Sequence, residues 1–180
     1  MLNKATMPHS NEIFRQATAA DTDRCWLILQ QGKAQMFREG KHQWTEAYPS
    51  RQSVETDIAN GNAYVIERRG SVIAYGAVIA NGEPAYQQIA HLWLTNADYV
   101  VVHRLAVADE AKRQGVATRF FGYAEQWALQ RGIHSFKVDT NYDNFYMQRL
   151  LRSQGFMYCG DVHYPQGDRM AYEKVLACDK

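Results

Sequence analysis

The chain has 180 residues, of which 46% are hydrophobic and 22% charged, and its formal net charge is +1. This composition excludes a disordered tail protein and argues against a strongly basic nucleic-acid-binding protein. The length suits one domain better than two. We expect that domain to span residues 12–180, behind a flexible N-terminus of residues 1–11.

The cysteines and the hydropathy pattern indicate a reducing environment. Cys25, Cys159 and Cys178 are odd in number and far apart, which does not suit a disulfide framework. The first residues lack the apolar core of a signal peptide, and no apolar run is long enough to span a bilayer. We therefore expect a cytoplasmic protein that neither associates with membranes nor binds nucleic acid.

The first third of the chain predicts one strand and two helices. Residues 12–17 form the strand, and residues 18–21 resemble a capping box that opens the first helix. Ser53 is the expected N-cap of the second helix, which ends at Gly61. The connector between the helices, residues 44–49, is rich in aromatic side chains.

From residue 62 onward strands dominate, and they alternate with two more helices. A hairpin over residues 63–80 turns at Arg69-Gly70, and residues 99–107 form the strongest strand in the sequence. An amphipathic helix follows over about residues 115–131 and ends at Gly132. Further strands are expected at 133–140, 156–160 and 170–176, with a helix at 144–153. This order predicts an α/β (α+β) fold with a mixed sheet.

The start of the amphipathic helix has the composition of an anion site. Small residues at Gly115 and Ala117 leave the first N–H groups of the helix accessible, with the positive end of the helix dipole behind them. Phosphate groups bind at such helix ends, and Lys112 and Arg113 add positive charge. An ordinary glycine-containing turn remains the alternative. The loop matches neither the P-loop nor the G-x-G-x-x-G pattern.

Two motifs resemble the GNAT superfamily of acyltransferases. Residues 112–117 (KRQGVA), directly after residues 105–107 (LAV), are similar to the signature [QR]-x-x-G-x-[GA], whose loop binds the diphosphate of CoA in that family. Asn144, followed eleven residues later by Gly155-Phe156, is similar to a second family pattern. The element order resembles the family from Glu12 to about Lys174.

The resemblance implies a central mixed sheet of about six or seven strands flanked by about four helices. It also implies that the strand of residues 105–107 splays from its neighbour and that acetyl-CoA is the co-substrate. The implied cofactor-binding residues are Leu105, Ala106, Val107, Lys112, Arg113, Gln114, Gly115, Val116, Ala117, Thr118 and Asn144.

The catalytic groups are less well marked. Leu151 stands where many members of the family carry the tyrosine that protonates the departing thiolate, so water or another hydroxyl must take that role. Tyr146 is our candidate for the acid. His103 lies four residues before Val107 and is our candidate for the base that accepts the amine proton. A hydrogen-bonded core histidine is the alternative.

Trp44 and Tyr48 are candidates for the acceptor pocket, because aromatic rings suit cationic amines. A core role is the alternative for both. We expect a primary amine of a small molecule as acceptor. Acetylation of a protein N-terminus or lysine stays open, as does a CoA-binding module that lacks catalysis. The sequence specifies neither the acyl group nor the oligomeric state, and a homodimer stays open.

Metal sites have little support. Residues 139–144 resemble the opening of an EF-hand loop, but the sixth position of that loop is Asn144 rather than glycine and the twelfth is Leu150 rather than glutamate. The histidines and cysteines match neither H-E-x-x-H nor C-x-x-C. We therefore expect no metal.

Overall fold

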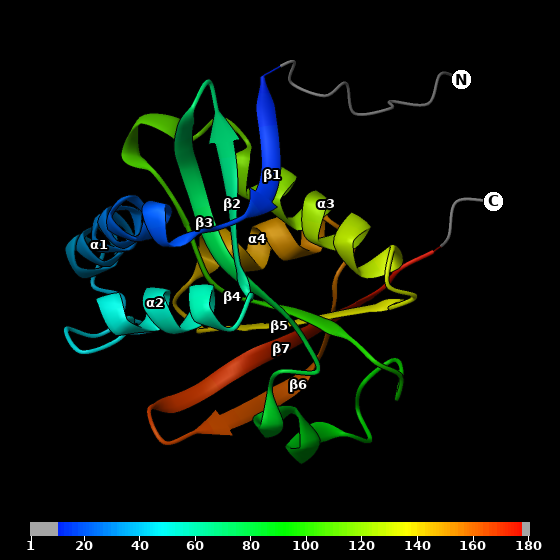
Figure 1. Cartoon of the computed structure of the whole chain (residues 1–180). Helices are drawn as coiled ribbons and strands as arrows, with labels where there is room; N and C mark the ends of the chain where they lie inside the picture. The colour runs from blue at the N-terminus through cyan, green and yellow to red at the C-terminus, as the bar shows by residue number, and fades with distance from the viewer. Residues whose placement is uncertain (1–10, 178–180) are drawn as a thin grey trace.

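The computed structural model describes residues 11–177, so Cys178 and nearly all of the expected flexible terminus, residues 1–11, lie outside the described residues. Within residues 11–177 seven strands form one sheet in the order β1-β2-β3-β4-β5-β7-β6 (Figure 1). The strands are β1 (Glu12–Gln16), β2 (Ala63–Arg68), β3 (Ser71–Ala80), β4 (Val100–Val107), β5 (Ser135–Thr140), β6 (Met157–Tyr164) and β7 (Gly167–Val175). The α-helices are α1 (Thr22–Arg38), α2 (Arg51–Ala59), α3 (Val116–Leu129) and α4 (Phe145–Ser153).

Three short 3-10 helices connect these elements: η1 (Ala19–Asp21), η2 (Pro84–Ile89) and η3 (Asp109–Ala111). The β4–β5 pair is parallel and the other five pairs are antiparallel. The sheet is therefore mixed, which confirms the fold class expected from the element order.

Three expectations need correction. The N-cap of α2 is Ser50, not Ser53, because the two serines exchange hydrogen bonds: Ser53 N donates to Ser50 Oγ at 3.3 Å, and Ser50 N donates to Ser53 Oγ at 3.1 Å. The last two strands are longer than expected and form a hairpin. A bulge between Tyr158 and Gly160 breaks the alternation that marks a strand in sequence. The 3-10 helix η2 was not expected.

Apolar side chains fill both faces of the sheet. On one face α3 and α4 pack through a cluster that includes Phe120, Phe121 and Phe136. On the other face α1 and α2 cover β2, β3 and β4 through residues such as Leu29 and Val65. Figure 1 shows the two helix pairs on opposite sides of the sheet. A site can open between the two helix pairs where neighbouring strands of the sheet separate.

That opening lies between β4 and β5. The register pairs only Val100 with Phe136 and Val101 with Lys137, whereas β4 stays paired with β3 as far as Val107. A bulge accompanies the separation: Arg104 has φ +56° and the β3–β4 register shifts opposite it. Bulges bend a strand and strengthen its local twist. Beyond Val101 the edge of β4 that faces β5 is therefore free for a ligand, as the family resemblance implies.

Candidate active site

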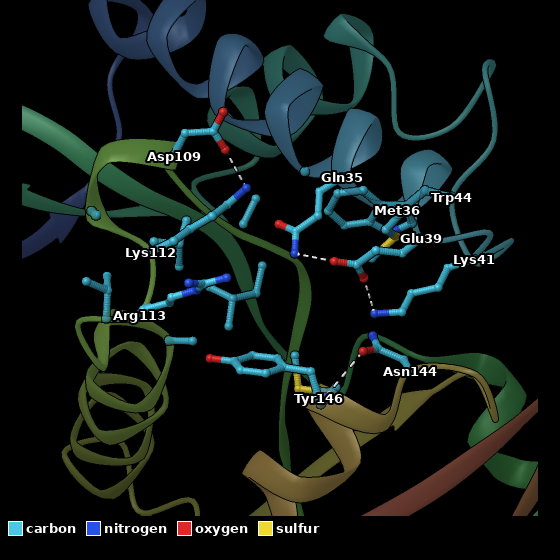
Figure 2. Close-up of a pocket in the computed structure, with 18 of the residues that line it drawn as sticks. Gln35, Met36, Glu39, Lys41, Trp44, Asp109, Lys112, Arg113, Asn144 and Tyr146 are labelled. Atoms are coloured by element: carbon cyan, nitrogen blue, oxygen red, sulfur yellow. Dashed lines mark hydrogen bonds and ion pairs between the residues drawn. The ribbon is translucent and has the colours of Figure 1, made fainter.

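A cavity of about 800 Å³ lies beside the free edge of β4, between the C-terminal end of α1 and the N-terminal ends of α3 and α4 (Figure 2). Nine of the eleven expected cofactor-binding residues line it: Leu105, Ala106, Val107, Lys112, Arg113, Gly115, Val116, Ala117 and Asn144. Tyr146 and Trp44 also line it, whereas Gln114, Thr118, His103 and Tyr48 are not among its lining residues.

The sequence did not predict that the end of α1 lines the same cavity as the expected cofactor residues. Gln35, Met36, Arg38, Glu39 and Lys41 form this wall. The helical spacing of α1 predicts which of its faces is buried, but no signal in it says that the last turn of α1 lies opposite the first turn of α3. That juxtaposition follows from the packing of α1 against β3 and β4.

The first turn of α3 offers free N–H groups to the cavity. Its N-cap is Gly115, which has φ +71° and no side chain to cap the helix. Arg113, two residues earlier, is also left-handed, at φ +62°. Both residues line the cavity, so the loop turns its backbone toward the space where the helix dipole is positive. This is the geometry of an anion site.

The charges around the cavity agree with an anion. Four cations line it, and two of them have carboxylate partners: Lys41 lies 2.5 Å from Glu39, and Lys112 pairs with Asp109. For the other two, Arg38 and Arg113, no carboxylate of residues 11–177 lies within ion-pair distance. Two positive charges therefore remain available to phosphate groups.

Asn144 shapes the opposite end of the cavity. Its Oδ1 accepts a hydrogen bond from Met147 N at 3.2 Å, so the side chain serves as the N-cap of α4. Its Nδ2 donates to Gln43 Oε1 at 3.5 Å, and the same oxygen accepts Asn141 N at 3.3 Å. Gln43 thus ties the connector after α1 to the start of α4. Both ends of the Asn144 amide are thus hydrogen-bonded within the protein. Asn144 therefore shapes the cavity by capping α4, and it does not point a free amide into the cavity.

Tyr146 and Leu151 have opposite environments. Tyr146 is 62% exposed and, in Figure 2, its hydroxyl extends into the cavity on the side of Arg113. Leu151 is fully buried in the cluster beneath α3 and α4. Position 151 therefore supplies packing and no hydroxyl.

His103 lies on the face of β4 away from α3. It follows Val101 by two residues, and Asp139 follows Lys137 by two, so the two side chains flank the point where β4 and β5 part. His103 Nε2 lies 3.7 Å from Glu83 Oε2. Burial lowers the pKa of His103 to about 4, although Asp139 opposes that shift. The imidazole is therefore neutral at pH 7, and its lowered pKa makes it a weaker base than an ordinary histidine.

Asp139, which the sequence analysis considered only as a calcium ligand and rejected, lies on the same side of the opening as His103. Its carboxylate accepts hydrogen bonds from Tyr86 Oη at 2.9 Å, Tyr164 Oη at 3.0 Å and Arg169 Nη1 at 3.2 Å. Glu83 lies in the same cluster, and burial raises its pKa. These residues come from η2, β5 and the β6–β7 hairpin, so only the folded sheet brings them together.

The two aromatic acceptor candidates lie apart. Trp44 is 6% exposed and its ring packs against Gly32, where an added Cβ would meet the ring at 2.9 Å. Tyr48 is 42% exposed, and its hydroxyl accepts a hydrogen bond from Arg104 Nη1 at 2.9 Å. Arg104 also donates two hydrogen bonds, of 2.6 and 2.9 Å, to the carboxylate of Asp57. Trp44 therefore borders the cavity, whereas Tyr48 lies beside the bulge of β4.

Within residues 11–177 no group of three or more histidine, cysteine, aspartate or glutamate side chains is arranged to hold a metal ion. None of the helices in the described part of the chain is long and apolar enough to cross a bilayer.

Comparison with known proteins relates the sequence and the fold of this chain to one family. An acetyltransferase of the GNAT family from Streptococcus agalactiae is 32% identical, with a TM-score of 0.81 over 93% of this chain and 96% of that one. A GNAT-family acetyltransferase from Listeria monocytogenes shares the fold, with a TM-score of 0.73 at 16% identity over 92% of this chain and 95% of that one.

A shorter match is to the aminoglycoside N(6')-acetyltransferase type 1 of Serratia marcescens. It is 30% identical over 81 residues, which are 45% of this chain and 56% of that protein, so the match spans about half of the relative. The sequence pattern of the acetyltransferase (GNAT) family matches residues 33–156. Because this pattern covers more than half of the chain, the protein belongs to the acetyltransferase (GNAT) family.

Proposed function

We propose that this protein, as a single domain over residues 12–180, transfers an acetyl group from acetyl-CoA directly to a primary amine of a small molecule. The observation that carries the proposal is the cationic cavity, which joins the uncapped first turn of α3 to the free edge of β4. A phosphate-bearing thioester needs an anion site at one end and backbone hydrogen-bonding groups along its arm. The cavity provides both in one continuous space.

The residues present suit CoA. The N–H groups after Gly115, together with Arg113, would hold the diphosphate, and Arg38 is placed for a further phosphate. Leu105, Ala106 and Val107 would bind the pantetheine arm through their backbone. An N–H of β4 would also polarise the thioester carbonyl, a contribution of about 2.7–4 kcal/mol where such donors have been removed.

Attack on the thioester requires a neutral amine. An alkyl amine with a pKa of about 10.4 is mostly protonated at pH 7, so a proton must leave it. We propose His103 as the acceptor of that proton, or as the group that orients the accepting water. Its position at the point where β4 and β5 part supports this role. Its lowered pKa favours the second option, because a base with a pKa of about 4 holds a proton weakly at pH 7. Glu83, 3.7 Å away, would stabilise the imidazolium.

The departing thiolate also needs a proton. Position 151 has no hydroxyl, so we propose that Tyr146 or a water molecule supplies it. The exposed hydroxyl of Tyr146 in the cavity supports the first option (Figure 2).

The acceptor is proposed as a cationic small molecule that approaches from the His103 side. Glu83 and Asp139 lie there with Tyr86 and Tyr164, and carboxylates and aromatic rings both favour amines. The name of the Serratia relative points to the same substrate class. Acetylation of a protein N-terminus or lysine, and CoA binding without catalysis, remain the alternatives.

The test combines binding with transfer. Calorimetry should detect CoA and acetyl-CoA binding, whereas NAD should bind much more weakly. Thiol release from acetyl-CoA should then be measured with aminoglycosides, polyamines, and peptides that carry a free N-terminus or lysine. Faster thiol release with a small amine than with the peptides supports the proposal. Absence of acetyl-CoA binding at millimolar concentration contradicts all of it, and binding without release for any amine favours the inactive module.

A further inference from the structure

Two arginines connect a buried carboxylate on the edge strand β1 to the loop that precedes α3. Glu12 is the first residue of β1, and its side chain is only 1% exposed. Glu12 does not line the cavity, and it lies far in sequence from the loop that precedes α3. Two arginines connect it to Gln114, the residue before the N-cap of α3.

The first connection runs through Arg119, the fourth residue of α3. Arg119 Nε and Nη2 donate to the two carboxylate oxygens of Glu12 at 2.8 and 2.9 Å. The third nitrogen, Nη1, donates to the main-chain oxygen of Gln114 at 2.7 Å. The guanidinium therefore joins the carboxylate to the backbone of the loop, and Glu12 fixes its orientation.

The second connection runs through Arg68 at the end of β2. Its Nε and Nη2 donate to Glu12 Oε1 at 2.9 and 2.7 Å, and its Nη1 donates to the side-chain oxygen of Gln114 at 2.7 Å. Both carbonyl groups of Gln114 are thus held by arginines that share one carboxylate. Burial alone would raise the pKa of Glu12, but the hydrogen bonds from the arginines hold it below its usual value. Glu12 remains charged at neutral pH.

The hydrogen bonds to Gln114 matter because the backbone of this loop is strained. Gln114 lies between Arg113 at φ +62° and Gly115 at φ +71°. A left-handed residue other than glycine costs about 1–2 kcal/mol, and such conformations persist only where the surroundings enforce them. Release of Gln114 would let Arg113 relax and would turn the N–H groups of the loop away from the cavity.

We propose that Glu12 is a positioning residue for the CoA diphosphate, acting through Arg119 and Arg68 on the loop at Gln114. The inference rests on the proposed function, because it takes the cavity as the cofactor site. It adds a residue outside the two motifs that resemble the family, on the opposite side of the loop from the ligand.

The test uses Glu12→Gln, which keeps the size of the side chain and removes its charge. We expect its Kd for CoA, measured by calorimetry, to rise about tenfold or more, since small displacements of binding groups have effects of this order. With an accepted amine, the kcat/KM for acetyl-CoA should fall relative to that for S-acetylpantetheine, which lacks the diphosphate. A purely structural role would lower both rates by the same factor.

The matched control is Glu67→Gln, which removes the ion pair of Glu67 with Arg15 on the same two strands. It should leave the Kd for CoA within about twofold of the wild type. Should Glu12→Gln fail to fold, Arg119→Lys keeps the charge of α3 but cannot reach Glu12 and Gln114 together, and the same rise in Kd is expected. Wild-type CoA affinity in either folded variant would overturn the inference alone, whereas a wild-type protein that does not bind CoA would overturn the proposed function as well.

Discussion

Gly115 offers a sharp test of the cofactor site, because Gly132, after the end of the same helix, has the same φ and serves as a control. Gly115 and Gly132 both have φ +71°, at the start and after the end of α3. Any other residue there costs about 1–2 kcal/mol, which lowers the Tm of a domain of this size by about 2–8 °C. A Cβ on Gly115 would meet Arg119 Nη1 at 3.3 Å, whereas a Cβ on Gly132 would have no neighbour within 4 Å.

Glutamate at the two positions separates strain from charge. A carboxylate about 5 Å from the diphosphate, at an effective dielectric constant of about 20, costs about 3 kcal/mol per unit charge. Gly115→Glu should therefore raise the Kd for CoA more than a hundredfold. Gly132→Glu should lower the Tm to a similar extent and leave CoA affinity unchanged. Calorimetry on both folded variants decides: equal CoA affinities would mean that the diphosphate does not bind at the start of α3.

Three further predictions concern two buried polar groups, His103 and Glu173. His103→Ala should lower kcat by about 10²–10⁴-fold with little change in the Kd for acetyl-CoA. The residual rate should rise with pH as free amine becomes more abundant. A folded variant with wild-type turnover would remove His103 from the mechanism. Because its folded pKa of about 4 lies below the ordinary 6.5, His103 takes up its proton first in the unfolded state. The wild type should thus lose up to about 3 kcal/mol of stability as pH falls from about 6.5 to 4, and urea unfolding of His103→Gln should show less of this loss. Glu173 is fully buried and accepts hydrogen bonds of 2.6 Å from Leu94 N, Thr95 Oγ1 and Ser135 Oγ. Glu173→Gln should cost about 2–4 kcal/mol in urea unfolding, and unchanged stability would contradict its role as the anchor of the η2–β4 connection.

The parts of the fold that follow from local sequence were predictable. The strand at 99–107 and the helix after Gly115 carry strong periodicity, and the loop between them has a composition that indicates its chemistry. The errors lie where local signals compete. Ser50 and Ser53 are both good N-caps, and their mutual hydrogen bonds make Ser50 the cap and Ser53 its partner. The β6–β7 hairpin was shortened in the prediction because its bulge disturbs the alternation.

The two sides of the candidate site also differ in how far local sequence predicts them. A cofactor site made largely of backbone groups leaves a short motif, because glycine and small residues must stand at fixed places in one loop. The side assigned to the acceptor is made of side chains from η2, β4, β5 and the β6–β7 hairpin, which are brought together only where β4 and β5 part. No spacing in the sequence joins Glu83 to Asp139 or Arg169. A fold built on this opening can therefore keep its cofactor site while the acceptor side changes. Substitutions around Asp139 should accordingly alter the KM for the amine more than the Kd for CoA.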